Sequence, residues 1–428
     1  MIKTSADPAS AADPAGAARN AVRFEHVDVI FGRNAAAALA MLDMGEGRDT
    51  ILEKTDNLVA VHDASLFVNE GEILVLMGLS GSGKSSLLRC INGLNTVTRG
   101  KVMVRAGGDE VDVASCSGEV LRELRRNRIS MVFQQFALMP WLTVRDNVAF
   151  GLEVRGVAKV ERDRIVDEKL KLVRLDKFAD KFAHELSGGM QQRVGLARAF
   201  ATDAQILLMD EPFSALDPLI REHLQDELIE LQRALKKTIV FVSHDLDEAL
   251  KIGNRIGIME GGRIVQFGPP EDIVMRPVND YVRRFVASMN PLTVLKGGTL
   301  MRPVTDLKRD PTNPLIVELD RAGRCRVKID AAGRPTDLMI AGQPGRFIDY
   351  ATDLDLAKIG DYAMVTGNQR TPMRGAVLVR QITKRPLILL GSDGELLGVV
   401  GEHELYRGML KQTDLGQSDP EAHISPDA

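Results

Sequence analysis

The sequence predicts an α/β domain with a largely parallel sheet, followed by a smaller α+β domain. From residue 59 to about residue 290, apolar runs of strand length alternate with helical stretches, the pattern of a parallel sheet covered by helices. Residues 218–237 are expected to form one of these helices, because their apolar residues make a single helical stripe. After about residue 290, proline, glycine and short strand-like pieces become more frequent, and we therefore place a domain boundary there.

Before this alternation, the chain is expected to contain a disordered segment, a strand and two helices. Residues 1–20 are rich in alanine, proline and small polar residues without periodicity, which predicts disorder. The stretch "VRFEHVDVIFG" (22–32) alternates like a strand. Residues 33–57 are typical of two short helices, the second beginning with a capping box of Thr50 and Glu53.

After the boundary, the best-formed part is residues 386–410, which predict a strand, an Asp-Gly turn, a second strand and a helix. The polar residues 413–428 are expected to be a tail. The sequence thus predicts a first domain over 21–290 and a second over 291–412.

Composition, charge and the lengths of apolar runs narrow the class of protein. The net charge of -4 argues against nucleic acid as the main partner, because such proteins carry a basic excess. Cys90, Cys116 and Cys325 show neither metal-ligand spacing nor a disulfide framework, so a reducing compartment is expected. The best apolar run, residues 73–79, is far shorter than the roughly 18 residues of a membrane span, and the N-terminus lacks the pattern of a signal peptide. Any link to a membrane is therefore expected to run through a partner protein.

A phosphate-binding loop is predicted at "GLSGSGKSS" (78–86), which fits G-x-x-x-x-G-K-[ST] directly after an apolar strand and before a helix. Such a loop turns successive backbone N–H groups toward phosphate oxygens at the positive end of a helix. Lys84 is expected to reach the β- and γ-phosphates, and the Ser85 hydroxyl to bind Mg²⁺. The predicted nucleotide-binding residues are Gly78, Leu79, Ser80, Gly81, Ser82, Gly83, Lys84, Ser85 and Ser86.

Four polar residues at the ends of other apolar strands fit the same chemistry. In "ILLMDEP" (206–212), Asp210 suits Mg²⁺ through its water shell, and Glu211 suits a base that orients the attacking water. His244 ends one strand and could contact the γ-phosphate or this water, while Gln134 ends another and could touch Mg²⁺ and water. By itself, a lone His or Gln at a strand end is more often structural, and two adjacent acids there fit a solvated turn equally well, but the phosphate loop favours the functional interpretation.

A second glycine-rich turn, "HELSGGMQQR" (184–193), opens another helix, and it completes a set of motifs. In order, the set comprises the phosphate loop, Gln134, "LSGGMQQR", Asp210 with Glu211, "SALD" (214–217) and His244. This set resembles the ATP-binding cassette (ABC) subunits, whose P-loop NTPase fold carries a helical subdomain, here expected at about 136–200. The resemblance covers roughly residues 22–290, and the signature sequence excludes most GTPases, kinases and helicases.

The resemblance implies how the residues share the work, with ATP and Mg²⁺ as cofactors. Lys84, Gln134, Glu211 and His244 would be catalytic, and Ser85, Gln134 and Asp210 would hold Mg²⁺. The signature residues Ser187, Gly188, Gly189 and Gln191 would bind the γ-phosphate held by a second copy of the chain, so a closed site requires a homodimer. The motif "SALD" would be the D-loop, and its residue at the site would be Asp217. Phe31 would stack on adenine, and Phe24 is the second candidate for this role.

Further stretches narrow the resemblance to a subfamily. "ILEKT" (51–55), "VSHDLDEAL" (242–250) and "NDYVRRFV" (279–286) resemble the ATPase subunits of importers for glycine betaine, proline betaine and choline. Such a subunit would lie at the cytoplasmic face of the inner membrane, with a transmembrane permease and a substrate-binding protein as partners and no nucleic acid. Trp141 departs from the histidine expected there; it is either a partly buried core residue or, as we expect, part of the permease interface.

Other interpretations stay open from the sequence. The cassette could serve another solute, such as an amino acid, or belong to a soluble ABC protein of translation or DNA repair. Those usually carry two cassettes or a long coiled-coil insertion, and this chain shows neither. The second domain resembles a degenerate pair of cystathionine-β-synthase-type (CBS) modules, with a small β-barrel as the competing fold and dimerisation as an alternative to ligand binding.

Overall fold

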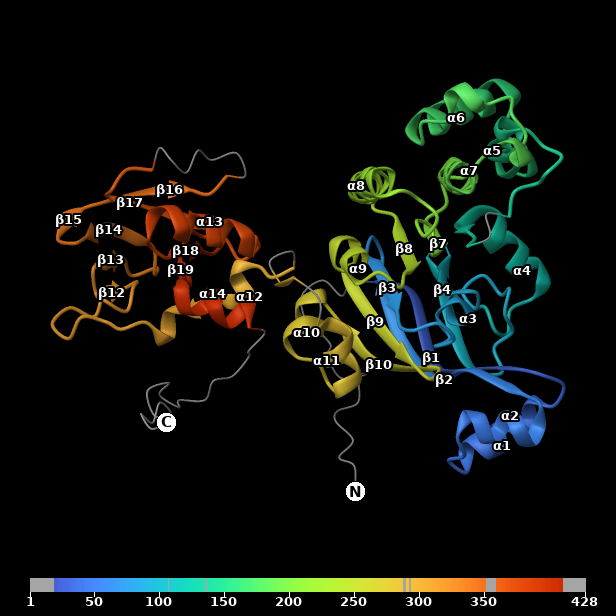
Figure 1. Ribbon diagram of the computed structural model, residues 1–428, viewed down its shortest axis with the longest axis horizontal. Helices are drawn as coiled ribbons and strands as arrows, with labels where there is room; N and C mark the ends of the chain where they lie inside the picture. The colour runs from blue at the N-terminus through green and yellow to red at the C-terminus, as the bar shows by residue number, and fades with distance from the viewer. Residues whose placement is uncertain are drawn as a thin grey trace, which may run out of the picture. The chain divides into compact units, whose positions relative to one another are not determined.

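The computed structural model describes residues 19–106, 108–134, 137–287, 290–291, 294–351 and 359–410 (Figure 1). The chain divides into two compact units, Met1–Pro269 and Pro270–Ala428. The expected disordered segment, apart from residues 19 and 20, and the expected polar tail lie outside the described residues. Among the helices that are described, none combines the length and apolarity that crossing a membrane would require.

The central sheet of the first unit has six strands in the order β10-β9-β3-β8-β7-β6 (Figure 1). The strands from β9 to β6 are parallel, and β10 pairs antiparallel with β9. Because the carboxyl ends of parallel strands meet at one edge, the residues that follow β3, β6, β7 and β8 come together there. The strands are β3 Ile73–Met77, β6 Ile129–Val132, β7 Ile206–Asp210, β8 Thr238–Val242, β9 Arg255–Glu260 and β10 Arg263–Gly268.

A four-stranded antiparallel sheet, in the order β2-β1-β4-β5, packs on the central one. Both sheets contribute to one apolar core, in which Phe24 and Leu66 of the antiparallel sheet join Leu74 and Val240 of the parallel one. The phosphate loop is thereby held between two rigid layers. The antiparallel strands are β1 Asn20–Phe31, β2 Leu58–Asn69, β4 Arg99–Ala106 and β5 Asp109–Asp112.

Two helices, α1 (Ala35–Asp43) and α2 (Arg48–Thr55), stand between β1 and β2, where the sequence predicted two. They have a small core of their own, made by Ile30, Ala38, Leu42, Ile51 and Val59. The predicted capping box is wrong. Helix α2 begins two residues before Thr50, after the N-cap Gly47, so Thr50 lies inside the helix and its side chain is no cap.

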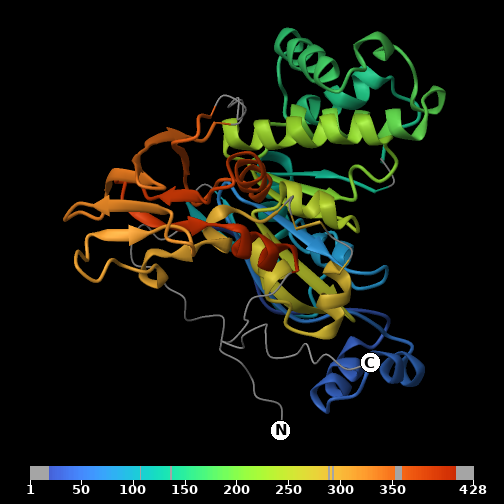
Figure 2. The ribbon, with the colours of Figure 1, turned by 60° about the vertical axis from the view of Figure 1, so that its left-hand side comes forward.

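The remaining helices of the first unit include a group over residues 144–201, which Figure 2 shows in green. In this group α5, α6 and α7 pack on one another. Helix α8 confirms the helix predicted from residue 218, and it ends at Leu235 because Lys236 takes the left-handed conformation. The helices are α3 Lys84–Leu88, α4 Gly118–Glu123, α5 Val144–Val154, α6 Lys159–Leu172, α7 Gly188–Ala201, α8 Pro218–Leu235 and α9 Leu246–Ile252.

The second unit begins at Pro270, whereas the sequence placed the boundary near residue 290. Helices α10 and α11 pack on each other, and Lys296 Nζ lies 2.5 Å from Glu271 Oε1, which ties α10 to the chain that follows. Neither contact can be inferred from a shift in composition. The helices of this unit are α10 Pro270–Met275, α11 Asp280–Val286, α12 Gly297–Leu300, α13 Met373–Thr383 and α14 Glu402–Met409.

Two sheets confirm the α+β class of the second unit. One is mixed, with the order β11-β19-β18-β17-β16, and the other is an antiparallel meander, β12-β13-β14-β15. The expected strand-turn-strand-helix over 386–410 is present as β18, β19 and α14, with Gly394 at a φ of +80° in the turn. The meander does not belong to the pattern of a CBS module, so the resemblance of the second unit to CBS modules stays a prediction. The strands are β11 Arg302–Pro303, β12 Ile316–Glu318, β13 Cys325–Ile329, β14 Pro335–Ile340, β15 Gln343–Pro344, β16 Arg346–Asp349, β17 Ala363–Gly367, β18 Leu387–Leu390 and β19 Leu396–Val400.

A buried carboxylate, Asp28, joins three strands and the end of α1. His62 Nδ1 and the Asp63 backbone N–H lie 2.8 and 2.9 Å from Asp28 Oδ1, and Arg99 Nε donates to Oδ2 at 2.6 Å. Arg99 also donates to Asp43, the last residue of α1. Burial by itself would raise the pKa of Asp28, but the hydrogen bonds from His62, Asp63 and Arg99 outweigh it and hold the pKa below its ordinary value of 3.8.

We expect Asp28→Asn to lower the free energy of unfolding by about 2–4 kcal/mol at pH 7, because it leaves the donors around a buried site without a charged acceptor. The pKa is lower in the folded state, so this stability is present above about pH 4 and is lost as the pH falls through the folded pKa. Urea unfolding of the first unit at pH 7 and pH 3 measures both effects. Asp43→Asn is the matched control, since Asp43 pairs with the same arginine but is exposed. If Asp43→Asn lowered the free energy of unfolding by more than about 1 kcal/mol, or if both variants lowered it equally, burial would not explain the contribution of Asp28.

Candidate functional site

The loop between β3 and α3 has the tight course that its glycines permit. Gly78 and Gly83 have φ of +145° and +98°, and a Cβ at these positions would lie 2.2 Å from Met259 O and 2.3 Å from Ala60 O. Only glycine fits at both points. The loop curls around Lys84, whose Nζ donates to Gly78 O at 2.9 Å.

Lys84 is nearly buried, with 6% of its surface exposed. Burial lowers the pKa of its ammonium group, while the carboxylates of Glu211 and Asp210 act in the opposite direction. A cation that is removed from water in this way interacts strongly with an anion placed beside it. The loop therefore offers a fixed positive charge and backbone N–H groups at the start of a helix.

Asp210, the last residue of β7, is fully buried and faces this loop. Its Oδ1 accepts a hydrogen bond from Ser85 Oγ at 2.6 Å, and its Oδ2 lies 2.8 Å from Arg89 Nη2. The structure thus brings together the hydroxyl and the carboxylate that the sequence assigned to Mg²⁺. Arg89 was not identified from the sequence, because it lies just after α3, as the C-cap of that helix, and carries no motif.

The carboxylate of Glu211 is contacted by two of the other predicted catalytic side chains. Gln134 Nε2 donates to Glu211 Oε2 at 3.2 Å, and His244 Nδ1 lies 3.3 Å from the same oxygen. Glu211 has a φ of +47°, and its carbonyl oxygen accepts from Gln192 Nε2 at 3.1 Å. Three residues from three strand ends therefore meet at one carboxylate. Gln192, buried and bonded also to the Ala215 backbone N–H, is a support that the sequence did not reveal.

One cavity of about 400 Å³ opens between the loop and these strand ends. Most of the predicted nucleotide-binding and catalytic residues line it. These are Ser80, Gly81, Gly83, Lys84, Ser85, Ser86, Gln134, Glu211 and His244. Lys84 and Glu211 lie on its wall together, so the cavity combines an anion-binding side with a carboxylate that can accept a proton.

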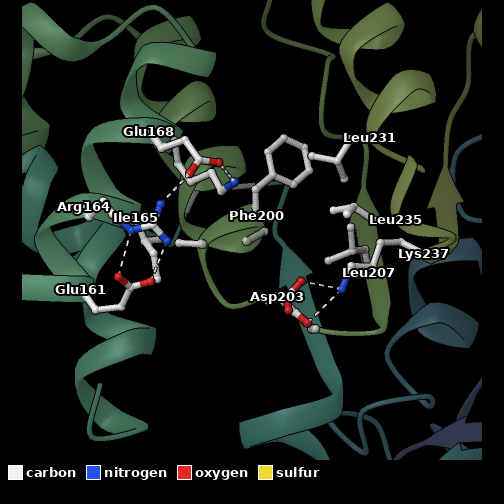
Figure 3. Close-up of a pocket in the computed structure, with 14 residues that line it drawn as sticks. Glu161, Arg164, Ile165, Glu168, Phe200, Asp203, Leu207, Leu231, Leu235 and Lys237 are labelled. Carbon is white, nitrogen blue, oxygen red and sulfur yellow. Dashed lines mark hydrogen bonds and ion pairs between the residues drawn. The ribbon is translucent and has the colours of Figure 1, made fainter. Parts of the chain in front are cut away.

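Another cavity, of about 280 Å³, lies among α6, α7 and α8 (Figure 3). Its charged residues pair with one another. Arg164 Nη2 lies 2.6 Å from Glu161 Oε1, and Lys237 Nζ lies 2.7 Å from Asp203 Oδ1. Because these charges are already compensated, this cavity is a weaker candidate for a charged ligand than the one at the phosphate loop.

The signature residues and the D-loop residue do not line the cavity of their own chain. Ser187 is the exposed N-cap of α7, where its Oγ accepts from the Met190 backbone N–H at 3.4 Å. Gln191 donates inward to Ala183 O at 2.8 Å, and Asp217 caps α8. The turn at Gly188 and Gly189 is therefore presented at the surface, at the start of a helix.

The two aromatic candidates for stacking on adenine differ in their exposure. Phe24 is buried in the core, which excludes it as a surface for adenine, whereas Phe31 is 41% exposed at the end of β1. Phe31 does not line the cavity itself. Trp141 is 71% exposed, so its interpretation as a core residue is wrong.

Comparisons with known proteins place these motifs in a family. The family profile described as "ABC transporter" matches residues 61–214. The chain is 50% identical, over 284 residues, to the glycine betaine/proline betaine transport system ATP-binding protein of Salmonella typhimurium, covering 66% of this chain and 70% of that protein. It is 40% identical, over 383 residues, to the glycine betaine/carnitine transport ATP-binding protein of Listeria monocytogenes, covering 89% and 95%. A solved ATP-binding cassette, described as a dimeric post-hydrolysis state bound to ADP and Pi, aligns at a TM-score of 0.50 and 32% identity over 58% of this chain and 98% of that one.

Proposed function

The chain belongs to the ATP-binding subunits of ABC transporters, and from this premise we propose that it is the ATPase that drives uptake of quaternary amines. The observation that carries the proposal is the convergence of Gln134 and His244 on Glu211, beside the loop that holds Lys84. The substrate class is taken from the similar proteins, which are described as transporting glycine betaine, proline betaine and carnitine.

The residues at the cavity fit MgATP. We expect the phosphates to lie on the backbone N–H groups of the loop, with Lys84 beside the β- and γ-phosphates. Ser85 Oγ and Asp210 Oδ1, 2.6 Å apart, supply the oxygen ligands that Mg²⁺ prefers. Gln134 lines the same cavity as Ser85, and we expect it to reach the ion through water. Bound there, Mg²⁺ would neutralise charge on the phosphates. Exposed Phe31 would stack on the adenine, a contact worth roughly 1 kcal/mol.

The hydrolytic step is assigned to Glu211 and its neighbours. The Glu211 carboxylate would orient the attacking water and accept its proton, and Gln134 and His244 would hold the carboxylate in place. His244 would in addition face the γ-phosphate. Lys84 would stabilise the negative charge that develops on the transferred phosphoryl group.

The proposed partners are a second copy of the chain, a permease and a substrate-binding protein. Solved cassettes similar to this chain are described as dimeric, and a similar protein is described as the ATP-binding protein of a transport system. We propose that a membrane permease is the transport partner and that Ser187, Gly188 and Gly189 complete the phosphate site of a second copy. Ser187 and Gly188 are exposed at a helix start, and none of the three lines the cavity of its own chain. A substrate-binding protein would act through the permease, and the subunit would lie at the cytoplasmic face of the membrane.

The permease would dock beside the loop that carries Gln134, which is called the Q-loop in this family. A cavity of about 370 Å³ there has both apolar and basic residues in its lining, the apolar ones including Leu94, Phe133, Phe150 and Val154 and the basic ones Arg125, Arg126, Arg155 and Arg198. Trp141 stands exposed in the same stretch of chain, between Gln134 and α5. Exposed apolar groups of this kind are typical of a contact surface. The second unit, which we propose to be CBS-like, would act as a regulatory or dimerisation module.

Deletion of the gene in its native host tests the proposal. Uptake of radiolabelled glycine betaine or choline should fall to background and return with the wild-type gene but not with Lys84→Ala, because that variant lacks the phosphate-binding cation. Unlabelled glycine betaine, proline betaine, choline, proline, sulfate and spermidine are then compared as competitors. Competition by sulfate or spermidine alone would assign another solute, and undiminished uptake in the deletion strain would argue against a role in this transport.

A further inference from the structure

Glu248, in the first turn of α9, is a buried acid for which the proposed mechanism has no use. It is 7% exposed, and the groups that hydrogen-bond to its carboxylate oxygens are uncharged: Gln225 Nε2 donates to its Oε1 at 3.0 Å, and Ser243 Oγ donates to its Oε2. Asp245 and Arg221 are charged groups that also act on it. Burying a carboxylate among neutral donors costs free energy. An apolar residue would pack more favourably in this position, so the carboxylate has to be explained by what it holds.

The Glu248 carboxylate stabilises the turn that carries His244. Ser243 Oγ also accepts a hydrogen bond from the Asp245 backbone N–H at 2.9 Å. A hydroxyl group has a single proton, and Glu248 Oε2 lies nearer to Ser243 Oγ than the other acceptor, Asp245 O at 3.3 Å. With the proton directed to Glu248, the lone pairs of Ser243 Oγ are turned toward the Asp245 N–H. The two residues on either side of His244 are thereby tied together, with the histidine at the exposed tip.

Helix α8 braces the same turn from the other side. Asp245 Oδ1 accepts from the Glu248 backbone N–H at 3.1 Å, and its Oδ2 lies 3.4 Å from Arg221 Nη1. Arg221 Nη2 in turn donates to Leu216 O at 3.2 Å. Glu211, Arg221, His244, Asp245 and Glu248 all line one small cavity, so the brace reaches the carboxylate that His244 faces.

We propose that Glu248, fixed by Gln225, is a positioning residue that aims His244 at Glu211 through the hydroxyl group of Ser243. The inference rests on the proposed catalytic role of His244. Glu248 does not line the cavity at the phosphate loop. It sets the orientation of the turn, and its removal leaves His244 chemically intact but free to point elsewhere.

The test is ATP hydrolysis by the full chain with its permease partner, together with the affinity for a fluorescent ATP analogue. Glu248→Ala and Ser243→Ala should each lower kcat by about 10- to 100-fold, since small misplacements of catalytic groups cost that much, while the KM for ATP and the nucleotide affinity stay within about twofold. Glu248→Gln keeps an acceptor oxygen for Ser243 and should restore activity to within about threefold of wild type. Asp247→Asn, an exposed acid on the same helix, is the control and should behave as wild type.

The decisive arm is the His244→Ala background, assayed by single-turnover hydrolysis. If Glu248 acts through His244, adding Glu248→Ala or Ser243→Ala there should produce no further loss. Losses that multiply, or wild-type kcat in folded Glu248→Ala, would overturn the inference. Should Glu248→Ala fail to fold in thermal denaturation, the comparison of Ser243→Ala in the two backgrounds decides alone. Full activity of His244→Ala by itself would instead count against the proposed role of the histidine.

Discussion

Glu211→Gln should bind ATP as tightly as the wild-type protein and hydrolyse it about 100- to 10,000-fold more slowly, the range associated with a general base. Glutamine has the shape of glutamate and keeps an acceptor for the Gln134 amide at the 3.2 Å position. It cannot accept a proton from the attacking water. The loss should therefore appear in kcat, measured by phosphate release, while the nucleotide Kd, measured by fluorescence titration, stays unchanged.

A matched variant separates this effect from a general change of charge. Glu260 ends β9, another strand of the same sheet, and is exposed, so Glu260→Gln removes one carboxylate from a strand end without touching the cavity. It should retain kcat within about twofold. Full turnover by Glu211→Gln, with the protein folded, would withdraw the catalytic assignment of Glu211 and leave the site as a nucleotide-binding one.

The geometry of this site could be predicted from the sequence because parallel strands impose it. Asp210 ends one short, fully buried strand and His244 follows another, and such strands end at a common edge. Gln134 follows β6 in the same way. The phosphate loop is equally local in origin, since its glycines are close together in sequence and the loop follows β3 directly.

The supports around the site could not be predicted in this way. Arg89 and Gln192 act on Asp210 and Glu211 from helices, and nothing in their local sequence distinguishes them from ordinary polar residues. The same holds for Glu248, whose neighbours Gln225 and Ser243 come from separate elements. Contacts of this kind depend on which helices pack together, and periodicity carries no information on that choice.

The second unit was harder to predict for a different reason. The strands of its meander, residues 316–344, are each only 2–6 residues long, too short for alternation to stand out from chance. Only β18, β19 and α14 combine a buried run, a glycine turn and an amphipathic helix. The capping box at Thr50 failed because the pattern S/T-x-x-E also occurs inside a helix, where it has no capping role.

Ser187→Arg is the second variant for which we expect a near-complete loss of hydrolysis, and the reason lies in the partner subunit. Ser187 does not line the cavity of its own chain, so ATP binding to the separate subunit should be unchanged. An arginine at the exposed start of α7 would place a long side chain where the second copy's phosphates are proposed to lie. ATP-driven dimerisation and ATP hydrolysis should both fall to background, although loss of the serine cap costs only about 1 kcal/mol.

Dimerisation is best measured by analytical ultracentrifugation with and without ATP, in the Glu211→Gln background, where the closed dimer is not dissolved by hydrolysis. Val160→Arg, at an 85% exposed position on α6, adds the same charge and bulk elsewhere on the helical group and should dimerise normally. Hydrolysis is measured separately, in variants that keep Glu211. If Ser187→Arg forms ATP-dependent dimers as Val160→Arg does and, with Glu211 present, hydrolyses ATP at the wild-type rate, the signature turn does not complete the partner's site. If it binds ATP, stays monomeric and is inactive with Glu211 present, the second glycine turn is half of a site that only two chains can close.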